Sequence, residues 1–384
     1  MNFQLSRRNF LQASTTIALS QMLLGCSNTK TTIQILFLEN SVPLQLIGDF
    51  NNTIKATEKV DFEPIAQITQ ILVRLTDLQS EEKPGEETKT WGNKTFTKSV
   101  IYPNLTTLGD AWLSYAIKQN SIQPLSVKNL TNWQKLPQSW QKLVRRDSQG
   151  NLADDGKIYG APYRWGSTII AYRSDKLDQL NLKVRDWADL WQPELRDRLS
   201  LLDSPRETIG LTLKKLGYSY NTKNLNSVSE LETELLALHQ QAKFYSSDHY
   251  LEPLILGDTW VAVGWSTDIL PLLKRYPNIK FVIPQSGASL WADIWVEPTK
   301  STNPSISKDE SMVNIVEQWI DYCWKPQAVK QISLFTDGIS PILPTLEPGE
   351  LPKDLKDNIF LNSTVLNSDK SEFHLPLEAK TQQQ

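Results

Sequence analysis

The 384-residue chain contains little cysteine and little histidine. Its two cysteines are Cys26 and Cys323, and the first lies in a segment that we expect to be processed. The mature chain then has no cysteine pair from which to form an internal disulfide. The histidines, His239, His249 and His374, are scattered without the spacing that metal ligands need. We therefore expect neither a metal site nor a stabilising disulfide.

The chain also lacks a strong net charge and the short motifs of common hydrolases. Its formal net charge is −3, which offers no basic surface to nucleic acid. The sequence holds no Gly-x-Ser-x-Gly elbow, no His-Glu-x-x-His motif and no histidine placed beside a nucleophile. We therefore expect no cofactor and no enzymatic activity of the hydrolytic or metal-using kind.

The one long apolar stretch near the N-terminus is too short and too polar to span a membrane. It covers residues 10–24 and follows Ser6-Arg7-Arg8-Asn9-Phe10-Leu11, a pattern typical of a twin-arginine export signal. It ends in Leu23-Leu24-Gly25-Cys26, which resembles a bacterial lipoprotein cleavage box. We expect residues 1–25 to be a signal, Cys26 to be lipidated and residues 26–31 to be a tether. The mature protein would then be periplasmic and anchored to a membrane by its lipid.

The order of apolar patterns after the tether predicts an α/β fold. Residues 32–38, 59–63 and 105–108 are typical of short strands, and each is followed by a segment with helical spacing of its apolar residues. This alternation predicts a parallel sheet with helices on its faces. A similar alternation returns between residues 199 and 275, which predicts a second lobe. Residues 133–146 are predicted to form an amphipathic helix, and the polar residues 80–98 an exposed insertion.

The stretch Gly287-Ala288-Ser289-Leu290-Trp291-Ala292-Asp293-Ile294-Trp295 combines aromatic and acidic residues at alternate positions. If it is extended, Trp291, Asp293 and Trp295 share one face. An aromatic face beside a carboxylate is what a site for an organic cation needs, because the ring attracts the cation and the carboxylate pairs with it. The alternative is a core strand that contains an aspartate by chance.

Further polar residues lie where predicted strands end. Asp110 and Trp112 follow the strand at 105–108, and ligands of parallel sheets bind beyond the carboxyl ends of the strands. Glu207 lies in Ser204-Pro205-Arg206-Glu207, which has the pattern of a helix capping box. Turn chemistry at Asp110 and capping by Glu207 are the alternatives to ligand binding. Cys323 lies on the apolar face of the predicted helix 312–324, which favours a buried thiol.

Four stretches between residues 160 and 341 resemble the spermidine/putrescine-binding branch of the bacterial extracellular solute-binding proteins that serve ABC importers. They are Gly160-Ala161-Pro162-Tyr163-Arg164-Trp165-Gly166; Trp187-Ala188-Asp189-Leu190-Trp191-Gln192-Pro193-Glu194; Pro205-Arg206-Glu207 with Lys214-Lys215-Leu216-Gly217-Tyr218; and Leu290-Trp291-Ala292-Asp293. The resemblance implies a two-lobed periplasmic binding protein fold of type II, with strands that cross a hinge between the lobes. It covers most of the mature chain but is weak before about residue 100.

The resemblance carries over only part of the family's ligand site. Trp265, Trp291, Asp293 and Glu207 match positions that flank or pair with the polyamine. An acidic position just before a helix is Ser204 here, with Asp203 one residue earlier. Aromatic positions of the first lobe correspond to Leu38, Ser41 and Ala111, and Asp110 with Trp112 are candidates to compensate for their loss.

These observations together predict the substrate-binding component of an ABC importer, anchored by lipid and acting as a monomer with a permease as its membrane partner. The expected ligand is a polyamine, spermidine or putrescine, or a related organic cation. We assign residues 32–163 with 292–340 to the first lobe, 164–291 with 341–376 to the second, and 377–384 to a tail. The alternative is an orphan solute-sensing or assembly lipoprotein of the same fold that binds another small polar ligand.

Overall fold

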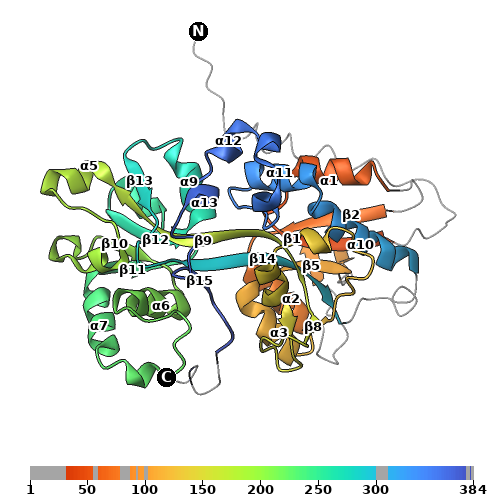
Figure 1. The fold of residues 1–384 in the computed structure, drawn as a ribbon, viewed down its shortest axis with the longest axis horizontal. Helices are drawn as coiled ribbons and strands as arrows, with labels where there is room; N and C mark the ends of the chain where they lie inside the picture. The colour runs from red at the N-terminus through yellow and green to blue at the C-terminus, as the bar shows by residue number, and fades with distance from the viewer. Residues whose placement is uncertain are drawn as a thin grey trace, which may run out of the picture.

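The computed structural model describes residues 32–54, 59–77, 87–91, 94–98, 103–299, 310–377 and 381. In these residues one eleven-stranded sheet has the path β11-β10-β12-β9-β14-β5-β1-β2, and β13, β15 and β6 pair with it off this path. Two long strands, β9 (Ala161–Arg173) and β14 (Ser289–Pro298), lie in the middle of this order. Figure 1 shows them running from one half of the molecule to the other. The architecture is therefore the two-lobed α/β fold with crossing strands that the sequence predicts.

The first lobe is built on a three-stranded parallel unit. β1 (Thr32–Leu38) pairs in parallel with β2 (Lys59–Ile65) on one side and with β5 (Leu105–Gly109) on the other. The connections contain α1 (Leu44–Asn51) and α2 (Ile68–Asp77), and the short helices η1 (Asp110–Trp112) and α3 (Leu113–Lys118) follow β5. The predicted order of strands and helices is thus confirmed for this lobe. It brings the C-terminal ends of β1 and β5 to one edge of the sheet.

The second lobe repeats the strand-then-helix order. β10 (Leu199–Leu201) lies between β11 (Ala242–Tyr245) and β12 (Val261–Trp265), parallel to both. The helices α6 (Pro205–Lys215), α7 (Leu231–Gln241), α8 (Glu252–Leu256) and α9 (Ser266–Leu273) follow the strands or connect them. Both β12 and β13 (Ile279–Val282) pair antiparallel with β9. This lobe also contains α5 (Ser174–Leu177), η3 (Asp178–Leu180), η4 (Trp187–Trp191), η5 (Pro193–Leu195) and η6 (Leu225–Ser227).

The other elements are short or lie late in the chain. They are β3 (Glu87–Trp91), β4 (Lys94–Lys98), β6 (Ile122–Gln123), η2 (Trp133–Lys135), α4 (Gln138–Leu143), β7 (Arg145–Arg146), β8 (Lys157–Ile158), α10 (Glu310–Cys323), α11 (Pro326–Phe335), η7 (Leu343–Thr345), η8 (Pro348–Glu350), α12 (Lys353–Lys356), α13 (Ile359–Asn362) and β15 (Glu372–Phe373). The single helix predicted for residues 133–146 is wrong. Pro137 divides it, because proline has no amide hydrogen and disfavours a helical residue before it.

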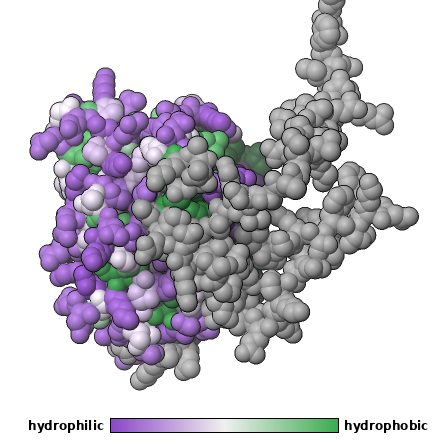
Figure 2. All heavy atoms as spheres, turned by 90° about the vertical axis from the view of Figure 1, so that its right-hand side faces the viewer, coloured by the Kyte–Doolittle hydropathy of each residue, from purple (hydrophilic) through white to green (hydrophobic). Residues whose placement is uncertain are grey.

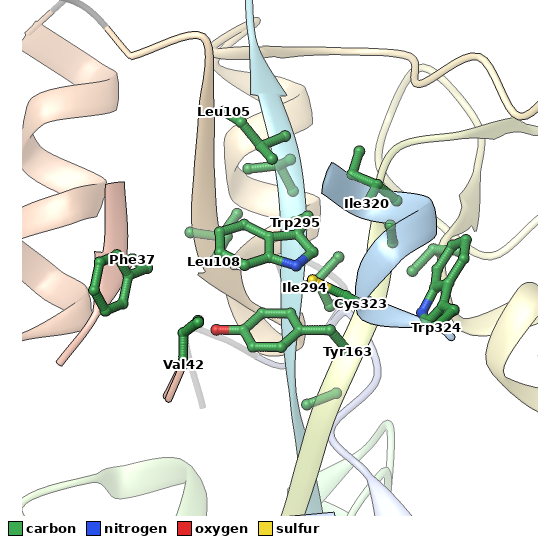
Figure 3. Close-up of a cluster of buried hydrophobic side chains, with 14 of the residues drawn as sticks. Phe37, Val42, Leu105, Leu108, Tyr163, Ile294, Trp295, Ile320, Cys323 and Trp324 are labelled. Atoms are coloured by element: carbon green, nitrogen blue, oxygen red, sulfur yellow. The ribbon is translucent and has the colours of Figure 1, made fainter. Parts of the chain in front are cut away.

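The apolar core of the first lobe surrounds the far end of β14. Trp295 is fully buried and stacks on Tyr163 of β9, with ring centroids 4.5 Å apart and planes 19° apart. Trp319 of α10 meets Trp295 edge-on, and Cys323 of the same helix is buried close by (Figure 3). The prediction of a buried Cys323 is confirmed, and burial raises the pKa of its thiol far above the ordinary value. This thiol therefore stays protonated and unreactive at neutral pH.

The C-terminal part of the chain packs on this same core. Ile342, Leu343, Leu355, Phe360 and Leu366 belong to the apolar cluster that contains β1, although the sequence led us to assign residues 341–376 to the second lobe. The boundaries of the two lobes as a whole stay a prediction. Of the other sequence expectations, the signal, Cys26 and the tether lie outside the described residues. The insertion at 80–98 lies only partly inside them, as the hairpin of β3 and β4.

Candidate functional site

One face of the ribbon formed by β9 and β14 carries most of the predicted ligand residues. The strands are antiparallel, with Trp291 opposite Gly166 and Asp293 opposite Arg164. Directly opposed residues of antiparallel strands point to the same face, so these four positions line it together. Trp295 continues the same alternation but lies in the first-lobe core. The predicted face is therefore real, but only Trp291 and Asp293 of its three residues lie at the crossing.

The indole of Trp291 lies across β9 at Gly166. A Cβ atom at position 166 would lie 2.2 Å from Cζ2 of Trp291 and 2.7 Å from Oγ of Ser266, so a larger residue has no room there. Trp291 is half-buried, and its Nε1 is buried without a hydrogen-bond partner among the described residues. The absence of a side chain at Gly166 thus gives the Trp291 ring room to lie over the ribbon. The indole N–H of Trp291 remains available to a ligand.

Asp293 is paired with a residue that we did not predict to belong to the site. Nε of Arg164 donates to Oδ2 of Asp293 at 2.7 Å, and the two side chains are only 5% and 6% exposed. Nη1 of Arg164 also donates to the carbonyl oxygens of Asn40 and Thr336, at 3.3 and 3.2 Å. The guanidinium carbon lies 5.6 Å from the ring centroid of Trp291. Asp293 therefore has its charge compensated within the chain.

Trp265 reaches the same region from the second lobe. It ends β12 opposite Thr168 of β9, and its backbone N–H donates to the hydroxyl of Tyr250 at 3.1 Å. The Tyr250 ring packs against Trp265 at a near-right angle, with centroids 6.3 Å apart. The next residue, Ser266, accepts a hydrogen bond from the amide of Ser167 at 3.2 Å. Trp265 is half-buried, so part of its ring remains accessible.

Glu207 lies at the start of α6 and points back to the crossing strands. The Oγ of Ser204 accepts the Glu207 amide, as the capping pattern predicts. The Glu207 side chain does not return the bond. Its Oε1 accepts from the hydroxyls of Thr168 and Ser289 at 3.1 Å each, and Oε2 is buried without a partner among the described residues. Burial raises the pKa of Glu207 to about 7, against the opposing effect of the two hydroxyl bonds.

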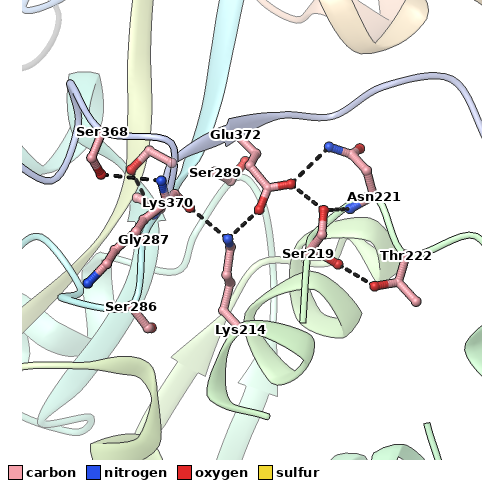
Figure 4. Close-up of polar contacts among 12 residues, drawn as sticks. Lys214, Ser219, Asn221, Thr222, Ser286, Gly287, Ser289, Ser368, Lys370 and Glu372 are labelled. Atoms are coloured by element: carbon pink, nitrogen blue, oxygen red, sulfur yellow. Dashed lines mark hydrogen bonds and ion pairs between the residues drawn. The ribbon is translucent and has the colours of Figure 1, made fainter. Parts of the chain in front are cut away.

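The C-terminal segment closes over the other side of Glu207. Nε2 of His374 lies 3.1 Å from the hydroxyl of Ser289, and burial lowers the pKa of this histidine to about 3. Just before it, Glu372 of β15 is paired with Lys214 of α6 and accepts the hydroxyl of Ser219 (Figure 4). β15 also pairs in parallel with β14 at Ser289. The segment therefore connects the crossing strand to the first helix of the second lobe.

Asp110 comes to the crossing from the first lobe, and so does Trp112, because a Cβ at Gly109, which is paired with Asp293, would lie 3.6 Å from Cδ1 of Trp112. The Oδ1 of Asp110 accepts the amide of Ala292 at 2.9 Å, while Oδ2 is buried without a partner among the described residues. Burial raises the pKa of Asp110 to about 7. Trp112 is exposed and packs edge-on against Tyr115, with ring centroids 6.3 Å apart. The Asp110 side chain therefore bonds the crossing strand and keeps one buried carboxyl oxygen without a partner among the described residues.

The site therefore combines half-buried indoles, buried carboxyl groups and one guanidinium. Glu207 and Asp110 have pKa values near neutrality, so an approaching cation can bind their ionised forms and displace a proton. Among the described residues, no group of three or more histidine, cysteine, aspartate or glutamate side chains is placed to hold a metal ion. Sequence reasoning missed Arg164 because its role depends on which residue of β14 lies opposite it.

The surface of the first lobe and the lengths of the helices bear on what a membrane contact would need. The face of the first lobe turned to the viewer in Figure 2 mixes hydrophilic and hydrophobic residues, and the hydrophilic ones prevail among those coloured. Within the described ranges, no helix is both long and apolar enough to cross a bilayer.

Comparison with known proteins gives a consistent family. The family model described as bacterial extracellular solute-binding protein matches residues 101–364. The putrescine-binding periplasmic protein of Escherichia coli is 28% identical over 238 residues, which cover 58% of this chain and 60% of that protein. The spermidine/putrescine-binding periplasmic protein of Salmonella typhimurium is 27% identical over 56% of this chain and 57% of its own length.

Solved structures agree on the fold. The spermidine/putrescine ABC transporter substrate-binding protein of Streptococcus pneumoniae superposes with a TM-score of 0.71 at 18% identity, covering 92% of this chain and 95% of that one. The spermidine/putrescine ABC transporter protein described for Listeria monocytogenes gives a TM-score of 0.66 at 21% identity, with the same coverage of both chains. The fold is thus that of the two-lobed periplasmic binding proteins. The matched residues make this chain a member of the bacterial extracellular solute-binding protein family.

Proposed function

We propose that this protein is the substrate-binding component of an ABC importer and binds a polyamine or a related organic cation between its lobes. It acts as a monomer and hands its ligand to a membrane permease. Family membership and the names of its relatives support the class of ligand. The protein binds its ligand without transforming it.

The observation that carries this proposal is the convergence of indoles and carboxyl groups at the β9–β14 crossing. Trp291 and Asp293 come from a crossing strand, Trp265 and Glu207 from the second lobe, and Asp110 from the first. A ligand held there touches both lobes and the strands between them. Its binding energy is then available to hold the lobes in a closed arrangement.

A thermal-shift screen followed by calorimetry tests the ligand class. The probes are spermidine, putrescine and n-butylamine, with amino acids and sugars as comparison ligands, because a ligand that binds only the folded state raises its melting temperature. We expect an organic amine to give the largest shift. We expect Trp291→Ala to lower amine affinity about tenfold or more. Trp260→Ala is the matched control, since Trp260 is half-buried in the second lobe and packs against Arg198 instead. A sugar or amino acid as the best ligand contradicts the proposal.

We also propose that lipid attached to Cys26 anchors the protein outside the cytoplasmic membrane after twin-arginine export. The export pattern and the cleavage box before Cys26 support this anchoring. Mass spectrometry of the protein purified from membranes should find a mature chain that begins at Cys26 and carries lipid. Cys26→Ser should release it from the membrane fraction. A mature chain that begins elsewhere refutes the anchor and leaves the ligand proposal untouched.

Two observations favour a second candidate function. The charge of Asp293 is compensated by Arg164, and the family's first-lobe aromatic positions are Leu38, Ser41 and Ala111. An orphan sensor or assembly lipoprotein with another small polar ligand fits such an altered site. Genes for a permease and an ATPase beside this one favour transport, and an isolated gene favours the sensor.

A further inference from the structure

Trp291 and Asp293, which we predicted to bind the cationic group of a ligand, already contact a cationic side chain of the protein, Arg164. Arg164 donates from Nε to the Asp293 carboxylate at 2.7 Å, and its guanidinium carbon lies 5.6 Å from the centre of the Trp291 ring. A carboxylate and an aromatic ring are what an ammonium group would use. Arg164 thus uses the same pair of residues, and both partners of the ion pair are almost fully buried.

The surrounding backbone holds the guanidinium in this position. Nη1 donates to the carbonyl oxygens of Asn40, which follows β1, and of Thr336, which follows α11. The aliphatic part of Arg164 packs on Gly338, where a Cβ would lie 2.6 Å from Cγ and 2.8 Å from Cδ. The next residue of each segment is tied to the other by two backbone hydrogen bonds between Trp165 and Ile339, at 2.8 and 2.9 Å. Arg164 is therefore a built part of the site.

The neighbourhood nevertheless keeps acidic groups for a ligand. Burial raises the pKa of Asp268, although its Oδ2 accepts a hydrogen bond from the Tyr250 hydroxyl at 2.8 Å. Burial also raises the pKa of Asp337, against the positive charges of Lys274 and Arg164. Asp110 and Glu207 add buried carboxyl oxygens without partners among the described residues. One guanidinium does not neutralise all of these groups. The site therefore still attracts positive charge, but less than it would without Arg164.

We propose that Arg164 takes the place of one ligand ammonium, so that the site selects an organic cation with a single ammonium group over diamines and polyamines. This inference rests on the proposed function for the place of binding and narrows its ligand. A second ammonium placed at Trp291 and Asp293 must either displace the guanidinium from a buried ion pair or lie beside it as a like charge. Both events oppose binding, because a buried charge left without its partner and like charges in close contact are unfavourable.

Calorimetry with two amines of equal length tests the proposal. n-Butylamine and putrescine share a four-carbon chain and differ by one ammonium group. We expect the wild-type protein to bind n-butylamine more tightly than putrescine. Arg164→Met frees Asp293 and should raise putrescine affinity about tenfold or more, the effect of one charge-paired contact. Arg173→Met is the matched control, because Arg173 lies on the same strand and pairs with Asp175 at 2.8 Å, far from Asp293. We expect this control to leave both affinities unchanged.

The outcomes separate this inference from the proposed function. Wild-type protein that prefers putrescine, or an Arg164→Met variant with no gain for it, overturns the inference while amine binding stands. Arg164→Gln serves if Arg164→Met fails to fold, since the amide can still donate to Asp293 without carrying charge. With this variant, too, a gain in putrescine affinity supports the inference, and the absence of a gain overturns it. If neither these two amines nor spermidine binds the wild type or the variants, the proposed function itself fails.

Discussion

Glu207 should make the stability of the protein depend on pH in a direction opposite to that of an ordinary carboxylate. Burial raises its pKa from 4.5 to about 7 in the folded chain, because Oε2 has no hydrogen-bond partner among the residues that the structure describes and the bonds from two hydroxyls to Oε1 only partly oppose the effect of burial. Between these values the folded chain keeps a proton that the unfolded chain has lost. The contribution to stability is therefore fully present below about pH 4.5 and is lost as the pH rises through 7.

The size of this effect follows from the two pKa values. One pH unit across a fully populated difference of one proton is worth roughly 1.4 kcal/mol, so Glu207 lowers the free energy of unfolding by about 3 kcal/mol between about pH 4 and pH 7. Glu207→Gln replaces the carboxyl group with an amide that stays neutral in both states. We expect this variant to match the wild type near pH 4 and to be more stable by up to about 3 kcal/mol near pH 7.

Chemical denaturation followed by tryptophan fluorescence at several pH values measures this difference. Glu232→Gln is the matched control, since Glu232 lies in the first turn of α7 and is exposed. We expect the control to change stability by less than about 0.5 kcal/mol at every pH. Asp110, with a similar pKa, remains in both proteins, so comparing them isolates Glu207. A Glu207→Gln variant that is less stable than the wild type near pH 7 would refute the reasoning, because it would show that the folded state favours the ionised form.

Two further substitutions test the crossing. Gly166→Ala should move the Trp291 ring, reducing amine affinity and stability by about 1–3 kcal/mol. Gly349→Ala, where a Cβ meets nothing within 4 Å, should change neither in calorimetry or denaturation. Asp293→Asn removes one partner of a buried ion pair and should cost about 3–5 kcal/mol of stability, measured by denaturation. Asp175→Asn breaks a more exposed pair and should cost less than about 1 kcal/mol. Equal losses of stability in Asp293→Asn and Asp175→Asn would contradict the larger contribution that we assign to the buried Arg164–Asp293 ion pair.

Much of the fold was predictable because its signals are local. The periodicity of apolar residues placed the strands and helices of both lobes, and Ser204 with Pro205 marked the start of α6. The helix predicted across Pro137 failed because apolar spacing was read without the missing amide hydrogen of that proline. The lobe assignment of residues 341–376 stays a prediction, because Ile342, Leu343 and Phe360 pack with β1 whereas Glu372 contacts α6 of the second lobe.

The sequence alone determined that Trp291, Asp293 and Trp295 share a strand face, since side-chain direction alternates along any strand. Only the tertiary structure decided that Trp295 is enclosed by α10 while Trp291 lies over Gly166 at the crossing. It also decided the partner of Asp293, because Arg164 lies 129 residues away and meets it only through the pairing of β9 with β14. Alternation follows from the geometry of a single strand, whereas what covers a face and which charge meets it depend on contacts between distant segments.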